Sequence, residues 1–211
     1  ILKRGIEFII LSPTPKIKDE LYRQWQLSNL PKTNNNNVNI SSQKEVYSDS
    51  LEDLSKIAFS PDKRMDNDIF NSSSISFILK CLDVSILLLA DSRPEIITES
   101  LKLNCFNQNK PLEVDYVKVS HHGSLNNTSQ EQLSLIKCNN FIISTNGGTA
   151  NHKHPSRETI ARIVYNSQRK DDELTIYFNY KIDDLKERIG DFINDMDFNE
   201  GNWSAITKNW F

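Results

Sequence analysis

Short apolar runs rich in Ile, Val and Phe alternate with stretches of helical periodicity along most of this 211-residue chain. Runs of this length, bounded by polar or turn-forming residues, are typical of strands in a sheet. Because helical segments separate the runs, the chain is predicted to form a layered α/β domain. Strands are expected at Ile6–Leu11, Ile75–Leu82, Val84–Ala90, Val114–Val119, Phe141–Ser144 and Leu174–Tyr180.

The segments between these runs carry helix signals. Pro94 suits a first helical turn, because the N–H that proline lacks would have no partner there. Thr128 with Glu131 three residues later is read as a capping box, and Ser156 as the start of another helix. Helices are expected at Ile17–Leu27, Pro94–Leu103, Ser129–Ile136 and from Ser156 onward.

Two regions depart from this alternation. Ser28–Ser50 is rich in Asn, Ser and Lys, has too little apolar surface to order itself, and is expected to be a flexible insertion. From Lys181 onward we expect an acidic amphipathic helix and an aromatic tail, which divides the chain into a domain at residues 1–180 and an element at 181–211. This helix would either pack on the sheet or offer a docking surface to a neighbouring domain. Apolar residues are expected on one side of the helix at Leu185, Ile189, Phe192 and Ile193, and in the tail at Trp203, Trp210 and Phe211.

All 4 histidines of the chain fall within one window, as His121/His122 and His152/His154. Upstream of them, Asp91 directly follows a strand-like run. Loops past strand ends are where α/β folds place ligands, and imidazole and carboxylate suit Zn²⁺, Mn²⁺ or Fe. Loop histidines beside an exposed acid would give the same spacing, so the pattern by itself leaves both interpretations open.

The segment Val117-Lys118-Val119-Ser120-His121-His122-Gly123-Ser124 resembles the strand and His-His-Gly-Ser motif of metallo-β-lactamase-fold hydrolases attached to the ComEC DNA-uptake channel. Further matching pieces occur in the same order and extend the resemblance over roughly residues 5–165. It implies an αββα sandwich. The other pieces are Ile6–Leu11 with Ser12-Pro13, Asn71–Ser74 before Ile75–Leu82, Val84–Ala90 running into Asp91, and Phe141–Ser144 leading to His154-Pro155.

The principal metal-binding signature of that family, His-x-His-x-Asp-His, belongs to the first half of its fold, and this chain has no such string. We therefore expect the chain to be the second half of the fold, cut from a longer protein or completed by residues outside it. By itself it is expected to hold too few ligands for two metal ions.

The resemblance also implies roles for individual residues. Asp91 would be the metal-bridging aspartate, which in the family usually follows a glycine, here replaced by Ala90. A structural alternative is that Asp91 or Ser92 caps the following helix. His154, directly before a proline, would lie at the rim of the active site as proton donor or oxyanion partner, whereas His152 is expected to be a surface residue.

His121 and His122 share one peptide bond, and successive side chains of an extended segment point to opposite sides. We expect His121 to be a metal ligand and His122 to face the substrate or to hold a ligand in place. Gly123 would let the backbone approach a bound phosphate, and Ser124 would contact it.

Composition limits the possible partners. With 25 basic and 28 acidic residues the net charge is −3, which argues against holding nucleic acid by bulk charge, although bound divalent ions bring positive charge of their own. Cys81, Cys105 and Cys138 form no C-x-x-C pair, so a cytoplasmic location is expected. Neither a signal peptide nor an apolar run of about 20 residues is visible, so this segment is not expected to contact a membrane.

The resemblance implies a hydrolase that uses Zn²⁺ or Mn²⁺, and we expect a phosphodiesterase or nuclease within a larger bacterial protein for DNA processing or antiviral defence. Its partners would be nucleic acid as substrate and the first half of the fold or a neighbouring domain. The alternative is a degenerate domain of the same fold that serves as a scaffold or interaction module without activity.

Overall fold

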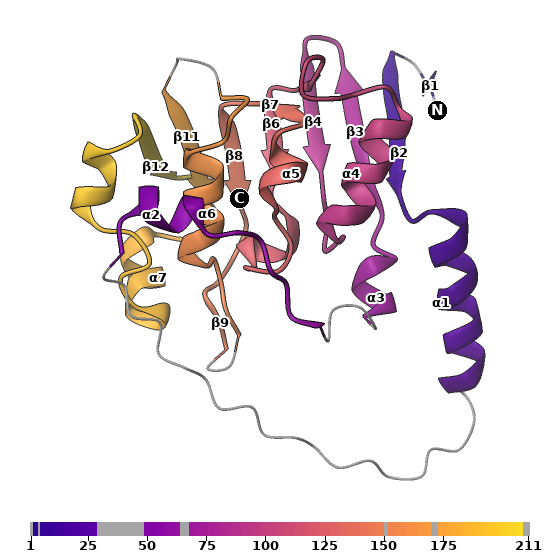
Figure 1. Ribbon diagram of the computed structural model, residues 1–211, viewed down its shortest axis with the longest axis horizontal. Coiled ribbons are helices and arrows are strands. Elements are labelled where there is room, and N and C mark those ends of the chain that lie inside the picture. Colours follow the sequence, from indigo (N-terminus) through magenta and orange to yellow (C-terminus); the bar gives the residue numbers. More distant parts are fainter. Residues whose placement is uncertain are drawn as a thin grey trace.

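The computed structural model describes residues 2–3, 5–28, 49–63, 68–149, 152–169 and 173–208, and it shows an α/β fold around a mixed sheet (Figure 1). The insertion expected over Ser28–Ser50 lies almost entirely outside the described residues, as do Trp210 and Phe211. The side chain of His152 is also outside them.

The central sheet has 8 strands in the order β1-β2-β3-β4-β6-β8-β11-β12. Neighbours from β1 to β4 are antiparallel, whereas β4, β6, β8, β11 and β12 are parallel to one another. The strands are β1 (Leu2–Lys3), β2 (Ile6–Ser12), β3 (Ser76–Cys81), β4 (Val84–Leu88), β6 (Tyr116–Lys118), β8 (Asn140–Ile143), β11 (Leu174–Phe178) and β12 (Trp203–Thr207). Two small pairs lie outside this sheet, β5 (Leu112–Glu113) with β7 (Ile136–Lys137) and β9 (Gly148–Thr149) with β10 (His152–Lys153).

Each expected strand is present, and so is each expected helix. The helices are α1 (Pro15–Ser28), α2 (Leu51–Lys56), α3 (Ile69–Ser72), α4 (Pro94–Leu103), α5 (Gln130–Leu133), α6 (Arg157–Val164) and α7 (Ile182–Ile189). Two 3-10 turns, η2 (Ser120–Gly123) and η3 (Asp195–Asn199), complete the described structure.

The predicted start of α5 is wrong by one residue. Ser129, and not Thr128, is its N-cap, and the Ser129 hydroxyl accepts a hydrogen bond from the backbone N–H of Gln132 at 3.1 Å. The helix is also shorter than expected, because Ile136 already belongs to β7. Ser156 does cap α6, as predicted.

The C-terminal helix α7 ends before the apolar residues Phe192 and Ile193 that were assigned to it. Gly190, with φ of 90°, ends the helix in a conformation that favours glycine. Phe192 and Ile193 are nonetheless fully buried in the core with Leu185. Trp203 then opens β12, which pairs with β11, so this segment packs as part of the domain.

One face of the sheet is packed against helices. Alternate strand residues such as Ile78, Leu87, Val117, Phe141 and Ile176 have at most 1% of their surface exposed and share one core with α4, α5 and α6, which lie side by side over the sheet (Figure 1). Full burial of a side chain of this size contributes about 1.5–3 kcal/mol. This face therefore fixes the register of the strands.

The opposite face of the sheet keeps its apolar side chains partly exposed. Strand pairing aligns one row of residues across it, with 48% exposure for Ile10 and 40% for Ile206 at the two ends. Between these ends the side chains are half-buried. The row is Ile10, Phe77, Leu88, Lys118, Ile142, Tyr177 and Ile206.

A buried ion pair ties the start of α6 to the C-terminal segment. Both N–H groups at the end of Arg157 donate to the Asp197 carboxylate at 2.6 Å, and the two side chains are only 5% and 4% exposed. Arg157 also donates to the backbone carbonyls of Phe192 at 3.2 Å and Asp49 at 2.9 Å. One side chain thus joins three segments that are distant in sequence.

Asp197→Ala is expected to lower the free energy of unfolding by about 3–5 kcal/mol, because it leaves the Arg157 charge buried without its carboxylate. Urea unfolding of the chain measures this loss. Glu131→Ala is the matched control, since it breaks an exposed pair with Lys102 of similar length, 2.7 Å, and should cost at most about 1 kcal/mol. Equal losses in the two variants would refute a special role for the buried pair.

Candidate active site

The parallel strands β4, β6, β8 and β11 end at one edge of the sheet, and polar residues follow each of them. Because adjacent parallel strands bring their carboxyl ends together, residues far apart in sequence meet at this edge. They are Asp91 after β4, His121 and His122 after β6, Ser144 and Thr145 after β8, and Asn179 and Tyr180 after β11.

The turn that carries Asp91 depends on a left-handed residue. Ala90 has φ of 48°, a conformation in which glycine avoids the strain that a Cβ causes. The carbonyl of Ala90 accepts a hydrogen bond from the N–H of His121 at 2.8 Å, so the turns after β4 and β6 are in direct contact. The N-cap of α4 is Arg93, so neither Asp91 nor Ser92 caps that helix.

Lys118, the last residue of β6, was assigned no role from the sequence. Its ammonium group donates to the carbonyl of Val119 at 3.1 Å. Burial lowers the pKa of Lys118, and the nearby negative charge of Asp91 partly opposes that effect. A half-buried cation therefore lies in the electrostatic field of Asp91.

The extended conformation expected for His121 and His122 is wrong. Both residues are left-handed, with φ of 44° and 58°, within the 3-10 turn η2. Their ring centroids lie 6.0 Å apart, and the ring of His154 lies 5.5 Å from that of His121. Three imidazoles from two separate segments therefore gather at this edge of the sheet.

Asn127 sets the proton position of His121. The Asn127 amide nitrogen donates to the carbonyls of Asp91 and Ser92, each at 3.3 Å, which turns its side-chain oxygen toward His121 Nδ1 at 3.2 Å. An amide oxygen only accepts, so Nδ1 must carry the proton. In the neutral ring, Nε2 then has the lone pair.

The same reasoning applies to His122. Its Nδ1 lies 2.6 Å from the carbonyl oxygen of Ser144, which can only accept, so Nδ1 donates. An Nδ1–H bonded to a carbonyl oxygen is the arrangement that commonly orients histidine ligands and bases in proteins. The chain thus presents two neighbouring imidazoles with Nε2 as the basic atom.

Gly123 and Ser124 support the local packing. A Cβ at Gly123 would lie 2.6 Å from the Cβ of Pro155, and the Gly123 carbonyl accepts from the N–H of Ser156 at 3.0 Å. Ser124 is 5% exposed, and its carbonyl accepts from the Thr159 hydroxyl at 3.1 Å. Neither residue lines the adjoining cleft, so their contact with substrate stays a prediction.

A cleft of about 310 Å³ opens beside the histidines. His122 and His154, the residues predicted to be catalytic, both line it. The Thr145 hydroxyl donates to the carbonyl of His154 at 2.9 Å, and the Thr145 N–H donates to the Asn179 side chain at 2.8 Å, so the loops around the cleft are bonded to one another. The remaining lining residues are Ser144, Thr145, Asn146, Gly148, Asn179 and Tyr180.

Sequence reasoning missed these lining residues and also Asn127. Ser144, Asn179 and Tyr180 fall inside the expected strands, whereas the observed strands β8 and β11 end before them and leave them, with Thr145, at the same edge as Asp91. For Asn127 no local signal existed, because its role depends on contacts with carbonyls about 35 residues earlier in the chain.

The donor set partly fits a metal ion. Nε2 of His121 and the carboxylate of Asp91 are suitable ligand types on two turns that touch. Among the described residues, no group of three or more His, Cys, Asp or Glu side chains is placed to hold an ion. A metal at this edge therefore remains a prediction.

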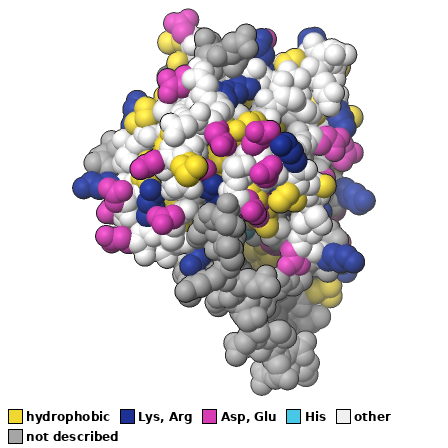
Figure 2. All heavy atoms as spheres, turned by 60° about the vertical axis from the view of Figure 1, so that its left-hand side comes forward, with side chains coloured by type: hydrophobic (Ala, Val, Ile, Leu, Met, Phe, Trp, Pro, Cys, Tyr) yellow, Lys and Arg dark blue, Asp and Glu magenta, His cyan; other side chains and the backbone are white. Residues whose placement is uncertain are grey.

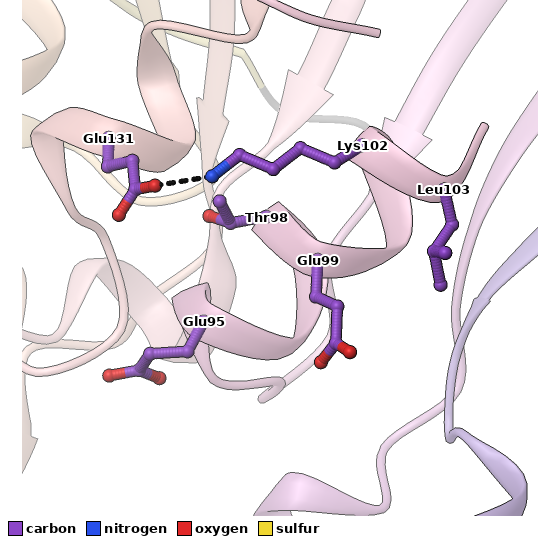
Figure 3. Close-up of a pocket in the computed structure, with 6 residues that line it drawn as sticks. All are labelled: Glu95, Thr98, Glu99, Lys102, Leu103 and Glu131. Carbon is purple, nitrogen blue, oxygen red and sulfur yellow. Dashed lines mark hydrogen bonds and ion pairs between the residues drawn. The ribbon is translucent and has the colours of Figure 1, made fainter. Parts of the chain in front are cut away.

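A second hollow, of about 410 Å³, lies between α4 and α5 and differs in charge (Figure 3). Lys102 is paired with Glu131, and the carboxylates of Glu95 and Glu99 point away from that pair. On the face seen in Figure 2, acidic and basic side chains are interspersed. The hollow between the helices is thus unsuited to a polyanion.

Comparison with known proteins gives no match: no protein-family model, curated protein or solved structure is significantly similar to this chain. In the described part of the chain, no helix combines the length and apolar character needed to cross a bilayer.

Histidine tautomers provide a direct test of the site. In their neutral state, His121 and His122 are both expected as Nδ1–H tautomers in long-range ¹H–¹⁵N spectra of the imidazoles. Asn127→Leu removes the acceptor of His121 alone, so only His121 should change toward Nε2–H. His122 is the internal control for an intact fold, and an unchanged His121 in the variant would exclude the assigned role of Asn127.

Proposed function

We propose that the chain is the second half of a metallo-β-lactamase-like αββα domain that hydrolyses phosphodiesters in nucleic acid with Zn²⁺ or Mn²⁺, as part of a longer bacterial protein. The observation that carries the proposal is the pair of imidazoles with Nδ1 bonded to fixed oxygens, at 3.2 Å for His121 and 2.6 Å for His122. Both lie at the carboxyl edge of the parallel strands, where α/β folds place their sites.

Each polar residue has a role in this proposal. Asp91 and His121 would hold the metal with ligands from outside the described residues, and two ions require the first half of the fold. A bound ion supplies positive charge and an acidified water. His122 Nε2 accepts a proton at the wall of the cleft, and His154 donates one to the leaving oxygen. Gly123 brings the backbone close to the phosphate, and Ser124 contacts it.

The partly exposed face of the sheet supports an αββα arrangement. Two sheets that pack face to face bury alternating apolar side chains at a spacing of about 10 Å. Apart from Lys118, the aligned row from Ile10 to Ile206 supplies such side chains on a face that α4, α5 and α6 do not cover. A second sheet from outside this chain would complete the domain and bring further ligands to the same edge.

The same face also favours the second candidate function, an inactive domain kept as an interaction module. The two candidates differ in the role of the histidines. An interaction module requires only the exposed sheet face, whereas a hydrolase also requires the basic Nε2 atoms beside the cleft. A cytoplasmic location and a role in DNA processing or antiviral defence belong to the proposal, and the free thiols of Cys81, Cys105 and Cys138 are compatible with the location.

Asp91→Ala in the intact protein should abolish cleavage of labelled DNA or RNA in the presence of Mn²⁺ or Zn²⁺, because a bridging carboxylate holds both ions. His154→Ala should reduce the rate about 10²–10⁴-fold as a lost general acid. His152→Ala is the matched control and should keep most activity. Full activity in Asp91→Ala, or none in a metal-loaded wild type, would leave the scaffold as the better candidate.

Leu79→Arg tests the proposed second sheet. Leu79 is a half-buried residue of β3 on the uncovered face, between Phe8 and Ile86 in the register. The charge should change the stability of the 211-residue chain by less than about 1.5 kcal/mol but abolish activity of the intact protein. Leu82→Arg, at a turn residue that is 91% exposed, should leave both unchanged. Normal activity in Leu79→Arg would exclude packing of a sheet on this face.

A further inference from the structure

Arg188, in the last turn of α7, lies beside the cleft. Its guanidinium donates to the carbonyl of Asn146 at 3.0 Å, and its central carbon lies 5.8 Å from the centroid of the Tyr180 ring. Asn146 and Tyr180 both line the cleft that His122 and His154 share. A cation and an aromatic ring therefore stand next to the predicted catalytic histidines.

Gly147 fixes α7 against this loop. With φ of 89°, it lies so close to the helix that a Cβ there would be 3.2 Å from Ile189 Cγ2 and 3.3 Å from Arg188 Cβ. The N–H of Gly147 also donates to the Thr145 hydroxyl at 3.0 Å. Arg188 thus projects from a helix end that packs tightly on the wall of the cleft.

Arg188 is not ion-paired with the described acidic residues of its own helix. Asp183 and Asp184 lie in the first turn of α7, yet among the described residues no carboxylate forms an ion pair with Arg188. A guanidinium carries five N–H donors, and one bond to a carbonyl leaves donors for a further acceptor. The chemistry of this group suits a phosphate, which it can bind through two parallel hydrogen bonds.

Tyr180 suits a nucleobase. Its ring is 40% exposed and lines the cleft. Bases stack on exposed aromatic side chains with little regard to sequence, provided that they are unpaired. A cleft of about 310 Å³ is at the small end of ligand pockets and admits one nucleotide, whereas a duplex cannot enter.

We propose that Arg188 and Tyr180 select single-stranded nucleic acid as the substrate, with a backbone phosphate on the guanidinium and the adjoining base on the tyrosine ring. This inference rests on the proposed function, because it places the scissile phosphodiester beside His122 and His154. It adds two substrate-binding residues that no sequence motif indicated, and it names the strand form that the cleft accepts.

Binding without metal tests the proposal separately from catalysis. A fluorescein-labelled twelve-nucleotide oligothymidylate is titrated with the 211-residue chain in EDTA at several salt concentrations, and anisotropy gives the affinity. Arg188→Met should weaken binding about fivefold and lower the salt slope by about 0.7, the value for one phosphate contact of a single strand. Tyr180→Leu should weaken it about 5- to 150-fold with an unchanged salt slope.

Matched variants separate these contacts from general effects. Lys186→Met removes the same charge from the same turn of α7 without touching the cleft lining, and Tyr180→Phe keeps the ring. Both should bind like the wild type, and the same strand in a duplex should bind at least about tenfold more weakly. Equal losses in Lys186→Met and Arg188→Met, normal binding by Tyr180→Leu, or no binding by the wild type would each overturn the proposal.

The outcome also distinguishes this inference from the proposed function. If the oligonucleotide binds through Arg188 and Tyr180 but the metal-loaded intact protein cleaves nothing, strand selection stands and the nuclease proposal fails. If the intact protein cleaves nucleic acid and neither variant changes cleavage or binding, the nuclease proposal stands and strand selection fails.

Discussion

Beneath the candidate site, hydroxyl groups without exposed surface bind the turns of the sheet to one another. The Ser76 hydroxyl donates to the carbonyl of Leu89 at 2.6 Å and lies 2.6 Å from the Ser92 hydroxyl, and the Ser120 hydroxyl donates to the carbonyl of Ser92 at 2.8 Å. Water does not reach these groups, so loss of one partner leaves the other unsatisfied at a cost of about 1–3 kcal/mol. The turns after β4 and β6 are therefore held in one arrangement, and with them Asp91 and His121.

Helix α6 also holds loops of the candidate site in place. The guanidinium of Arg162 donates to the carbonyls of Leu125 at 3.0 Å and Thr128 at 3.1 Å, in the loop that carries Asn127. Arg157 begins the helix three residues after His154 and is held by Asp197. Burying two guanidinium groups is costly unless they are paired, and here their terminal nitrogens are bonded while the buried Nε of each has no partner among the described residues. Arg157 and Arg162 lie on an otherwise apolar face of α6, where their hydrogen bonds join the helix to neighbouring segments.

The sequence predicts the strands well because their signal is local. Apolar runs at Ile75–Leu82 and Val84–Ala90 contain their own strand signal, and parallel order places the following Asp91 and His121 at a common edge. What the sequence could not supply is backbone conformation set by distant contacts. The left-handed pair His121/His122 is fixed by the bond from His121 to Ala90 and by the packing of Gly123 on Pro155, neither of which has a local signature. The pairing of Trp203 with Leu174 in β12 was missed for the same reason.

The left-handed residues Ala90 and His121 are joined by a hydrogen bond from the N–H of His121 to the carbonyl of Ala90, and His122 follows in the same conformation. Residues other than glycine in this conformation cost roughly 1–3 kcal/mol each and persist only where the surroundings impose them. Here the bond to Ala90 and the packing of Gly123 on Pro155 hold the histidine pair, and the buried serines hold the turns around it. The left-handed conformation turns both imidazoles of the dipeptide so that each Nδ1 donates to a fixed oxygen. Each Nε2 then keeps its lone pair. An extended His-His pair would send the two rings to opposite sides of the chain, and the Nε2 atoms of His121 and His122 would no longer lie together at this edge of the sheet.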